Sequence, residues 1–438
     1  MNNLWYPFTA MQDWSEGSQL SIVGGKGNYL QATDGNHYLD AVSSLWTNVH
    51  GHNHPHLNQA IKAQVDRISH STLLGLSNPL AEELATRLVQ VTPNGLNHVF
   101  YSDSGSTAVE IALKQAFQYW QLVGKPEKTR LAHLAEAYHG DTLGAVAVGG
   151  IDIFHKIFGP LLLETQSIPC PNSYKLNGTS NQDQAEKNSL QYLEALFQDS
   201  ADQTAALIVE PLVQGAGGIL THSPDYLTKV AALCKQFDVL LILDEVATGF
   251  GRTGTLFAAE QASITPDFMC LAKGITGGYL PLAATLSTDK IYEAFLAPRK
   301  DGKTFFHGHT YTGNALACAA ALANLEIFER EATIAKLPAK IEHLTAGLAG
   351  LESHPNIGDI RQCGLMVGVE IVASRDTGTL YPSDRFIGDQ ICMAARAHGV
   401  IIRNLTDVIV LMPPLSITTS ELDMMLSAMH AGIEIACK

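Results

Sequence analysis

The chain has 438 residues, of which 46% are hydrophobic and 16% charged, and its formal net charge is -15 at pH 7. This balance suits a large buried core and excludes an intrinsically disordered protein. The acidic charge and the lack of a Lys/Arg cluster argue against a nucleic-acid partner, because such a partner requires a basic face that neutralises phosphates. With about 150 residues in a typical domain, this length predicts two or three domains.

The cysteines and the apolar runs bear on the cellular compartment. Seven cysteines are scattered along the chain and form no C-x-x-C pair, which favours a reducing, cytoplasmic setting. The stretch MNNLWYPFTAMQDW lacks both the basic and the apolar part of a secretory signal. The longest apolar runs are far shorter than the ~20 residues that cross a bilayer. We therefore expect a cytoplasmic protein with no membrane partner.

The predicted elements, taken in chain order, indicate an α/β fold. Residues 1–50 contain strand-like segments around the turn signal Asp34-Gly35. The middle of the chain then alternates expected strands, HVFYS (98–102), AALIVEP (205–211) and VLLILDE (239–245), with expected helices at 104–120 and 224–237. Near-continuous apolar strands separated by amphipathic helices are typical of a mostly parallel sheet that is covered on both faces.

The end of the chain has a different pattern and predicts a smaller α+β unit. Expected helices at 332–351 and 384–399 alternate with strand-like segments, which lie at 357–372, 400–405 and 408–414. We therefore expect residues 51–328 to form a large cofactor-binding domain and residues 329–438 a small C-terminal domain. Residues 1–50 are expected to join the small domain.

An acid and a lysine mark the candidate catalytic centre. Asp244 lies in VLLILDE, at the end of a predicted strand, and ligands of open α/β sheets gather at the carboxyl ends of strands. Lys273 follows in the segment LAKGITGGYLP. Pyridoxal phosphate requires a lysine amine for covalent attachment and an acid that keeps its ring nitrogen protonated. On this spacing alone, an ordinary structural explanation, in which Asp244 caps a helix and Lys273 is a surface lysine, is about as favoured as the cofactor site.

Two further segments fit the same cofactor. SDSGSTAVE follows the strand HVFYS and opens a helix, so Gly105 and Ser106 are candidate phosphate contacts. Such a Ser-Gly-Ser sequence also occurs as an ordinary helix cap. Tyr138, in EAYHGDT, follows the next expected strand, where an aromatic ring would stack on the cofactor. A lone Tyr-His pair is more often structural.

Five motifs together resemble the class III aminotransferases, which are pyridoxal-phosphate enzymes of fold type I: SDSGSTAVEIALK, AYHGDT, DEVATGFGRTG, PDFMCLAKGITGG and HGHTYTGN. The resemblance covers nearly the whole chain. It implies that Lys273 forms the Schiff base and shuttles the proton, that Asp244 pairs with the ring nitrogen, and that Tyr138 lies against the ring. It also implies a homodimer, in which Thr310 of the partner subunit completes the phosphate site begun by Gly105 and Ser106. Glu210 and Gln214 would lie beside the cofactor, and Arg252 near the active site.

The segments LWYPFTAM, SSLWTNVHGHNHP and LMPPL further resemble the family members that convert 8-amino-7-oxononanoate to 7,8-diaminononanoate (7,8-diaminopelargonate) in biotin biosynthesis, by a ping-pong reaction. This resemblance implies that Trp46 forms a wall of the substrate pocket and that Arg403 binds the substrate carboxylate. Phe8, Gly308 and His309 would complete the substrate side. Phe8 and His309 match the variants that take lysine as amino donor, whereas S-adenosylmethionine is the donor of the best-known members. Both donors are kept as alternatives.

Three other functions share individual features with this sequence. Class III transaminases for other ω-amino acids would share Lys273 and Asp244, so only the substrate side discriminates against them. GFGRTG (249–254) has the spacing of a dinucleotide motif, but it neither follows its strand directly nor opens a long helix, which disfavours an NAD-dependent oxidoreductase. The alternating histidines at 50–56 would lie on one face, and so suggest a metal site, only if they formed a strand. Pro55 breaks such a strand. We expect no metal.

Overall fold

The computed structural model describes residues 3–17, 19–173 and 181–438. Its large domain is built on a seven-stranded sheet in the order β4-β12-β11-β10-β7-β5-β6. The bounds of these strands are β4 (Leu96–Ser102), β5 (Arg130–Leu134), β6 (Thr165–Ile168), β7 (Thr204–Val209), β10 (Leu240–Asp244), β11 (Phe268–Leu271) and β12 (Ala283–Thr288). All run parallel except β12, which is antiparallel to both of its neighbours. The expected mostly parallel sheet is confirmed, and the reversed β12 is an addition to it.

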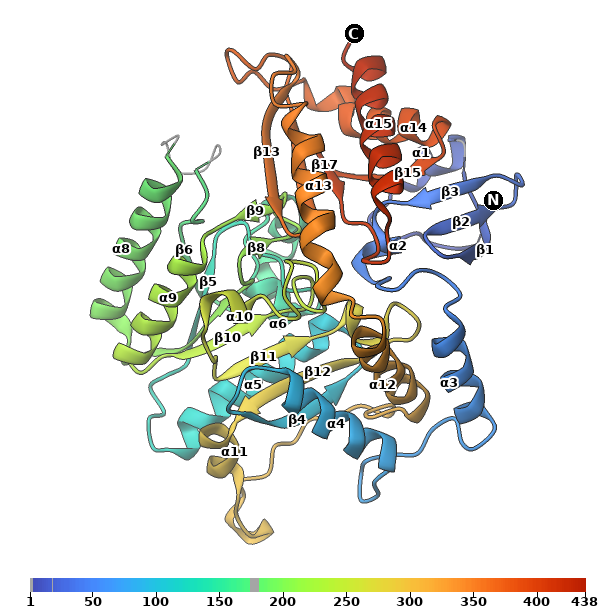
Figure 1. Ribbon diagram of the computed structural model, residues 1–438. Coiled ribbons are helices and arrows are strands. Elements are labelled where there is room, and N and C mark those ends of the chain that lie inside the picture. Colours follow the sequence, from blue (N-terminus) through green and yellow to red (C-terminus); the bar gives the residue numbers. More distant parts are fainter. Residues whose placement is uncertain (1–2, 18, 174–180) are drawn as a thin grey trace.

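Helices cover both faces of this sheet (Figure 1). Leu240 and Ile242 of β10 pack into one apolar cluster with α5 (Gly105–Leu122), whereas Leu241 and Leu243 belong to a second cluster with α8 (Gln182–Ser200) and α9 (Pro224–Gln236). Alternate residues of a strand point to opposite faces. A strand that is covered on both faces must therefore be apolar throughout, which explains the uninterrupted run at 239–243.

The small domain contains a four-stranded sheet in the order β13-β14-β17-β16, with helices packed against it. Its strands are β13 (Ile357–Cys363), β14 (Met366–Ile371), β16 (Arg403–Leu405) and β17 (Val408–Leu411). Its helices are η4 (Ile334–Lys336), α13 (Leu337–Ala349), η5 (Ser383–Arg385), α14 (Ile387–Ala397) and α15 (Thr419–Ala436).

The N-terminal strands join this C-terminal part of the chain. β1 (Ile22–Lys26), β2 (Tyr29–Ala32) and β3 (His37–Asp40) form a sheet whose fourth strand is β15 (Val400–Ile401), parallel to β3. Figure 1 shows these blue strands beside the red C-terminal elements. The pairing brings the N-terminal strands into one sheet with a C-terminal strand, and the division of the chain at residues 50 and 328 stays a prediction.

The remaining elements connect these parts. They are α1 (Met11–Glu16), α2 (Ser43–Trp46), α3 (Pro55–Val65), α4 (Pro79–Val91), α6 (Leu143–Ala147), α7 (Asp152–His155), η1 (Lys156–Leu161), β8 (Val213–Gln214), β9 (Leu220–Thr221), α10 (Ala259–Ala262), η2 (Lys273–Thr276), α11 (Asp289–Phe295), η3 (Arg299–Asp301) and α12 (Ala315–Arg330). Over the described ranges, no helix combines the length and the apolar character that a membrane span requires.

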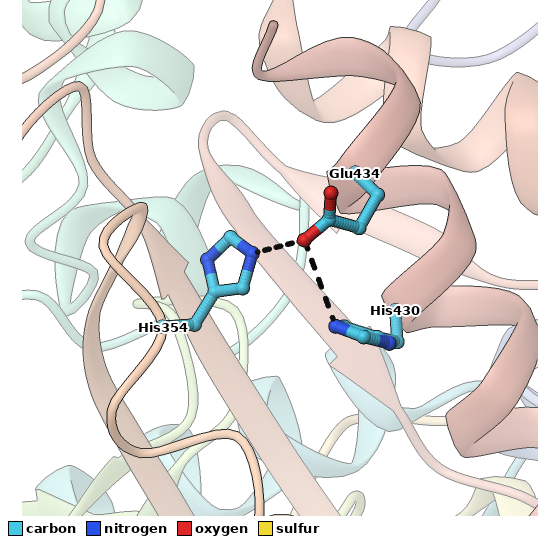
Figure 2. Close-up of side chains that lie close together, drawn as sticks. All are labelled: His354, His430 and Glu434. Carbon is cyan, nitrogen blue, oxygen red and sulfur yellow. Dashed lines mark hydrogen bonds and ion pairs between the residues drawn. The ribbon is translucent and has the colours of Figure 1, made fainter.

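A histidine cluster on the small domain ties α15 to the loop before β13 (Figure 2). His354 Nε2 lies 3.0 Å from Glu434 Oε1, and His430 Nε2 lies 3.8 Å from the same oxygen. Within the described residues, this is the group of side chains whose ligand atoms are close enough to hold a metal ion. However, His354 Nδ1 accepts a hydrogen bond from the amide of Asn356 at 3.1 Å. The proton of the neutral ring is therefore on Nε2, which donates to Glu434 and has no lone pair for a metal. The contacts fit a hydrogen-bonded cluster better than a metal site.

Candidate active site

A cavity of about 690 Å³ opens at the carboxyl-end edge of the large sheet. Residues that follow β4, β5, β10 and β11 meet in its lining, as expected for ligand sites of open α/β sheets. The lining contains half of the residues that the sequence singled out as chemical: Trp46, Gly105, Ser106, Tyr138, Glu210, Asp244 and Lys273.

Asp244 is the last residue of β10, and its carboxylate is held by two donors. Oδ2 lies 2.7 Å from His139 Nδ1, and Oδ1 accepts a hydrogen bond from the amide of Val246 at 3.0 Å. His139 is itself buried, and among the described residues its Nε2 has no hydrogen-bond partner. The imidazole therefore carries its proton on Nδ1 and orients the carboxylate. The sequence had placed His139 only as a neighbour of Tyr138, so its pairing with Asp244 was missed.

Lys273 lies two residues after the end of β11, and its backbone is strained. Its φ is 46°, in the left-handed region, which costs about 1–3 kcal/mol for a residue with a side chain. The amine lies 4.7 Å from the centre of the Trp46 ring. Burial lowers the pKa of Lys273, while the carboxylates of Asp244 and Glu210 act in the opposite direction. The net shift increases the share of unprotonated amine at neutral pH, and this is the form that attacks a carbonyl carbon.

The start of α5 forms the candidate phosphate site. Ser104 caps this 18-residue helix by accepting the amide of Thr107, and the helix begins at the cavity, whose lining includes Gly105 and Ser106. A Cβ added to Gly105 would lie 2.6 Å from Val246 Cγ1. Glycine is therefore required for the close packing of this helix start against the segment after β10. The Ser106 hydroxyl is engaged by Thr142: Oγ lies 2.7 Å from Thr142 Oγ1 and accepts the amide of Thr142 at 3.0 Å.

Tyr138 and Glu210 fix one side of the cavity. The Glu210 carboxylate accepts the amides of Tyr138 at 3.1 Å and Gly215 at 2.8 Å. Burial raises the pKa of Glu210 to about 7, although the nearby His139 acts against this shift. The Tyr138 hydroxyl donates to Asp141 Oδ2 at 2.8 Å. With its backbone and its hydroxyl both held, the Tyr138 ring has a fixed place in the lining.

Other predicted residues lie away from this cavity. Thr310, Gly308 and His309 line a second cavity, whose rim includes the exposed side chains of Leu74 and Phe306. They are not found near Lys273 in the single chain. For Thr310 this arrangement agrees with the prediction that it serves the phosphate site of a partner subunit.

The last four predicted residues are also absent from the lining, as far as the described residues show. Arg403 begins β16 with an exposed side chain, and the Phe8 ring lies edge-on to Phe154 at 5.6 Å. Gln214 is buried and donates to the Ala135 carbonyl at 2.7 Å. Arg252 is 1% exposed and bonds two backbone carbonyls, so it supports the fold around the cavity rather than facing into it.

The structure also bears on the two alternative motifs. Residues 249–254 form turns and bends and do not open a helix, which argues against a dinucleotide site. Three of the alternating histidines take three separate acidic partners: His52 with Asp40, His54 with Glu331 and His56 with Glu326.

Comparison with known proteins gives consistent matches over the full length. The sequence model of the class-III aminotransferase family matches residues 10–433. The adenosylmethionine-8-amino-7-oxononanoate aminotransferase of Geobacter sulfurreducens is 49% identical over 98% of this chain and 95% of its own.

Two solved structures superpose closely on this chain. The crystal structure of adenosylmethionine-8-amino-7-oxononanoate aminotransferase from Methanocaldococcus jannaschii has a TM-score of 0.94 and 42% identity, and covers 99% of this chain and 97% of its own. The PLP-bound amine transaminase of an uncultivated Pseudomonas species has a TM-score of 0.92 and 35% identity, and covers 100% and 99%. The same fold thus occurs in proteins named for different amine substrates.

Proposed function

This chain belongs to the class III aminotransferases, which use pyridoxal phosphate, and we propose that it transfers an amino group to 8-amino-7-oxononanoate and so forms 7,8-diaminononanoate for biotin biosynthesis. The observation that carries the choice of substrate is the 49% identity, over 98% of this chain, with a relative named for that substrate. The fold alone does not identify the substrate, because an amine transaminase superposes with a TM-score of 0.92 at only 35% identity. Transamination of another ω-amino acid is the alternative.

The residues of the cavity fit the cofactor. Lys273 offers an amine whose pKa is lowered, Asp244 offers a carboxylate oriented by His139, and the first turn of α5 would hold the phosphate at Gly105 and Ser106. When bound, pyridoxal phosphate supplies a protonated ring that withdraws electrons from the carbon bearing the amine. Asp244 would keep the proton on the ring nitrogen, and Tyr138 would lie against the ring.

Proton transfer is assigned to Lys273. The amine of Lys273 would hold the cofactor, and the same Nζ would take the proton from the substrate carbon that bears the amine and hold it for return. The low local polarity that lowers its pKa suits this role, since the amine must be unprotonated to accept a proton. Trp46 restricts water at the same atom, because its ring lies 4.7 Å from Nζ.

The substrate side is proposed from the sequence. Arg403 would bind the acceptor carboxylate, and Phe8, Gly308 and His309 would contribute to the donor pocket. Phe8 has no hydrogen-bonding group and lies against Phe154, which favours lysine over S-adenosylmethionine as donor. Arg403 is exposed in the single chain, as a residue that contacts a substrate from solvent would be.

We further propose that the active unit is a cytoplasmic homodimer. Thr310 lines a cavity whose neighbours Leu74 and Phe306 are 90% and 84% exposed. Large apolar side chains in such exposed positions favour coverage by another protein surface. A second copy of the chain would bring Thr310 of the partner subunit to the phosphate site at Gly105.

The test is a product assay with purified protein, pyridoxal phosphate and 8-amino-7-oxononanoate, with lysine and S-adenosylmethionine supplied separately. We expect mass spectrometry to detect 7,8-diaminononanoate with one donor, which identifies it, and no product with Lys273→Ala. Turnover of a simple ω-amine with pyruvate, together with no product from either donor, would instead establish the alternative.

A further inference from the structure

The wall of the cavity that faces Lys273 is formed by a strained turn. Ser43, Ser44 and Trp46 have φ values of 52°, 63° and 64°, which side-chain-bearing residues rarely adopt. Trp46 is 6% exposed and its ring lies 4.7 Å from Lys273 Nζ. A strained backbone persists only where its surroundings fix it. The contacts that fix this turn therefore also fix the position of Trp46.

Asp40 is the centre of those contacts. It ends β3, and its side chain is 0% exposed. Both of its carboxylate oxygens accept the amide of Ser44, at 2.9 and 2.8 Å, and Oδ1 also accepts the amide of Val42 at 3.4 Å. The Asp40 carboxylate thus holds the first amides of this turn, just before Trp46.

His52 holds Asp40 from the other side, with a defined tautomer. The amide of Gly51 donates to Asn48 Oδ1 at 2.7 Å, so Asn48 Nδ2 is the donor to His52 Nδ1 at 3.1 Å. With Nδ1 accepting, the proton of the neutral ring lies on Nε2, which donates to Asp40 Oδ2 at 2.8 Å. The orientation of His52 follows from this chain of hydrogen bonds.

A buried cation anchors the same segment to the rest of the fold. Arg252 donates to the carbonyl of Asn48 at 2.8 Å and to that of Pro413 at 2.7 Å. Burial lowers its pKa to about 10, and the negative charge of Asp40 acts in the opposite direction. Asp40 therefore has a second effect, since it compensates the buried positive charge beside the turn.

We propose that Asp40 and His52 are positioning residues that hold the turn 43–46 so that Trp46 faces Lys273, and that they thereby set the affinity for the substrate amine. The pair acts through Trp46 and touches no reacting atom. The inference rests on the aminotransferase activity of the family and not on the identity of the acceptor or the donor. His52 thereby has a role that the neighbouring alternating histidines, His54 and His56, do not share. Those two pair instead with the acids Glu331 and Glu326.

The two amide replacements of His52 provide a matched test. In His52→Gln the side-chain nitrogen lies close to the place of Nε2 and still reaches Asp40, whereas in His52→Asn it lies close to the place of Nδ1 and does not. His56→Asn is the control, because it removes a histidine of the same repeat whose partner is the half-exposed Glu326. All three variants are prepared with pyridoxal phosphate.

Two measurements separate positioning from a general structural role. The first is the half-reaction with whichever amine the wild type accepts, followed by cofactor absorbance, which gives an apparent KM and kcat. We expect His52→Asn to raise KM roughly tenfold with kcat little changed, and His52→Gln to restore it. The second is hydrogen exchange of the peptide that contains Ser44, which should accelerate in His52→Asn alone.

The proposal is overturned if His52→Gln and His52→Asn behave alike, or if thermal stability falls while KM and the exchange of this peptide stay as in the wild type. Asp40→Asn, which keeps the size of the side chain, replaces His52→Asn if that variant does not fold, and the same split between KM and kcat is expected. Because the amine is chosen by what the wild type accepts, failure to use 8-amino-7-oxononanoate leaves this test intact.

Discussion

His139 Nδ1 lies 2.7 Å from Asp244 Oδ2, and this hydrogen bond joins the loop after β5 to the end of β10. The two strands are not neighbours, since β7 lies between them. The contact bridges the carboxyl ends of three strands and determines which way the carboxylate faces. If Asp244 pairs with the ring nitrogen as we propose, the protonation of the cofactor ring would depend on a residue that does not itself touch that nitrogen.

The His139 contact predicts a difference between two variants. His139→Asn keeps an N–H close to the place of Nδ1, whereas His139→Leu removes the donor and leaves Asp244 Oδ2 without it. We expect kcat to fall about 10- to 100-fold in His139→Leu and considerably less in His139→Asn, as for other residues that orient a key ligand. Steady-state kinetics of the holoenzyme check this. Equal kcat values for the two variants would contradict an orienting role.

Removal of the Asp244 charge should have a larger effect than loss of His139. Asp244→Asn keeps the shape of the side chain but cannot hold a positive charge on the ring nitrogen, so we expect a loss of several kcal/mol of transition-state stabilisation. The measurement is kcat/KM with the cofactor at saturation. Turnover close to that of the wild type would show that Asp244 has only a structural part, as the cap of the segment beginning at Val246.

The lowered pKa of Lys273 predicts selective chemical labelling. After incubation with pyridoxal phosphate at neutral pH and reduction with borohydride, the label should lie on the peptide that contains Lys273. Lys273→Ala should abolish it, whereas Lys229→Ala, at a 58% exposed lysine, should not. Peptide mass spectrometry gives the site directly. A label spread over exposed lysines would show that Lys273 has no special reactivity.

Gly105→Ala should weaken cofactor binding through a steric conflict. The added Cβ would meet Val246 Cγ1 at 2.6 Å, so the start of α5 must shift, at a cost of about 1–3 kcal/mol. Equilibrium titration with pyridoxal phosphate should show the weaker affinity, and the additional change Val246→Ala should restore part of it. Gly159→Ala is the matched control, because no atom lies within 4 Å of its added Cβ.

His50 predicts a loss of stability on the acid side. Burial lowers its pKa from 6.5 to about 3, with the charge of His54 acting in the same direction. Between these two pH values the unfolded chain binds a proton that the folded protein does not, so the free energy of unfolding falls as the pH decreases, by up to about 1.4 kcal/mol per pH unit. In His50→Leu this part of the fall should disappear.

Urea unfolding of the cofactor-free protein at pH 7, 6 and 5 (roughly the range in which histidine titrates) measures this slope. His37→Gln, at an exposed position, should keep the slope of the wild type. If His50→Leu also keeps it, another group is responsible for the acid sensitivity.

The parts of the site that the sequence predicted are those with local signals. Asp244 ends an apolar strand, Gly105 opens a helix after a strand, and Lys273 lies between apolar and glycine-rich residues, so each was visible within about ten residues. The resemblance to a family placed them in one site. The structure then added the cavity in which they meet.

The parts that were missed depend on contacts between distant segments. Nothing around His139 identifies Asp244 as its partner, because the pair is formed only when β5 and β10 enter the same sheet. The reversed direction of β12 is likewise invisible, since a short apolar strand has the same pattern in either direction. The strained turn at Trp46 is also invisible in the sequence, because the buried Arg252, some two hundred residues away, anchors the carbonyl of Asn48 beside it.

The pairing of β3 with β15 has a consequence for biosynthesis. Leu39 and Asp40 pair with a strand that lies more than three hundred residues later in the chain, at Val400–Ile401. During translation the large sheet has all of its strands long before β15 leaves the ribosome, so the N-terminal segment must wait without its partner strand. The turn that bears Trp46 is then among the last parts to take its place. A nascent chain released before residue 400 is thus expected to have a folded cofactor domain with an incomplete cavity.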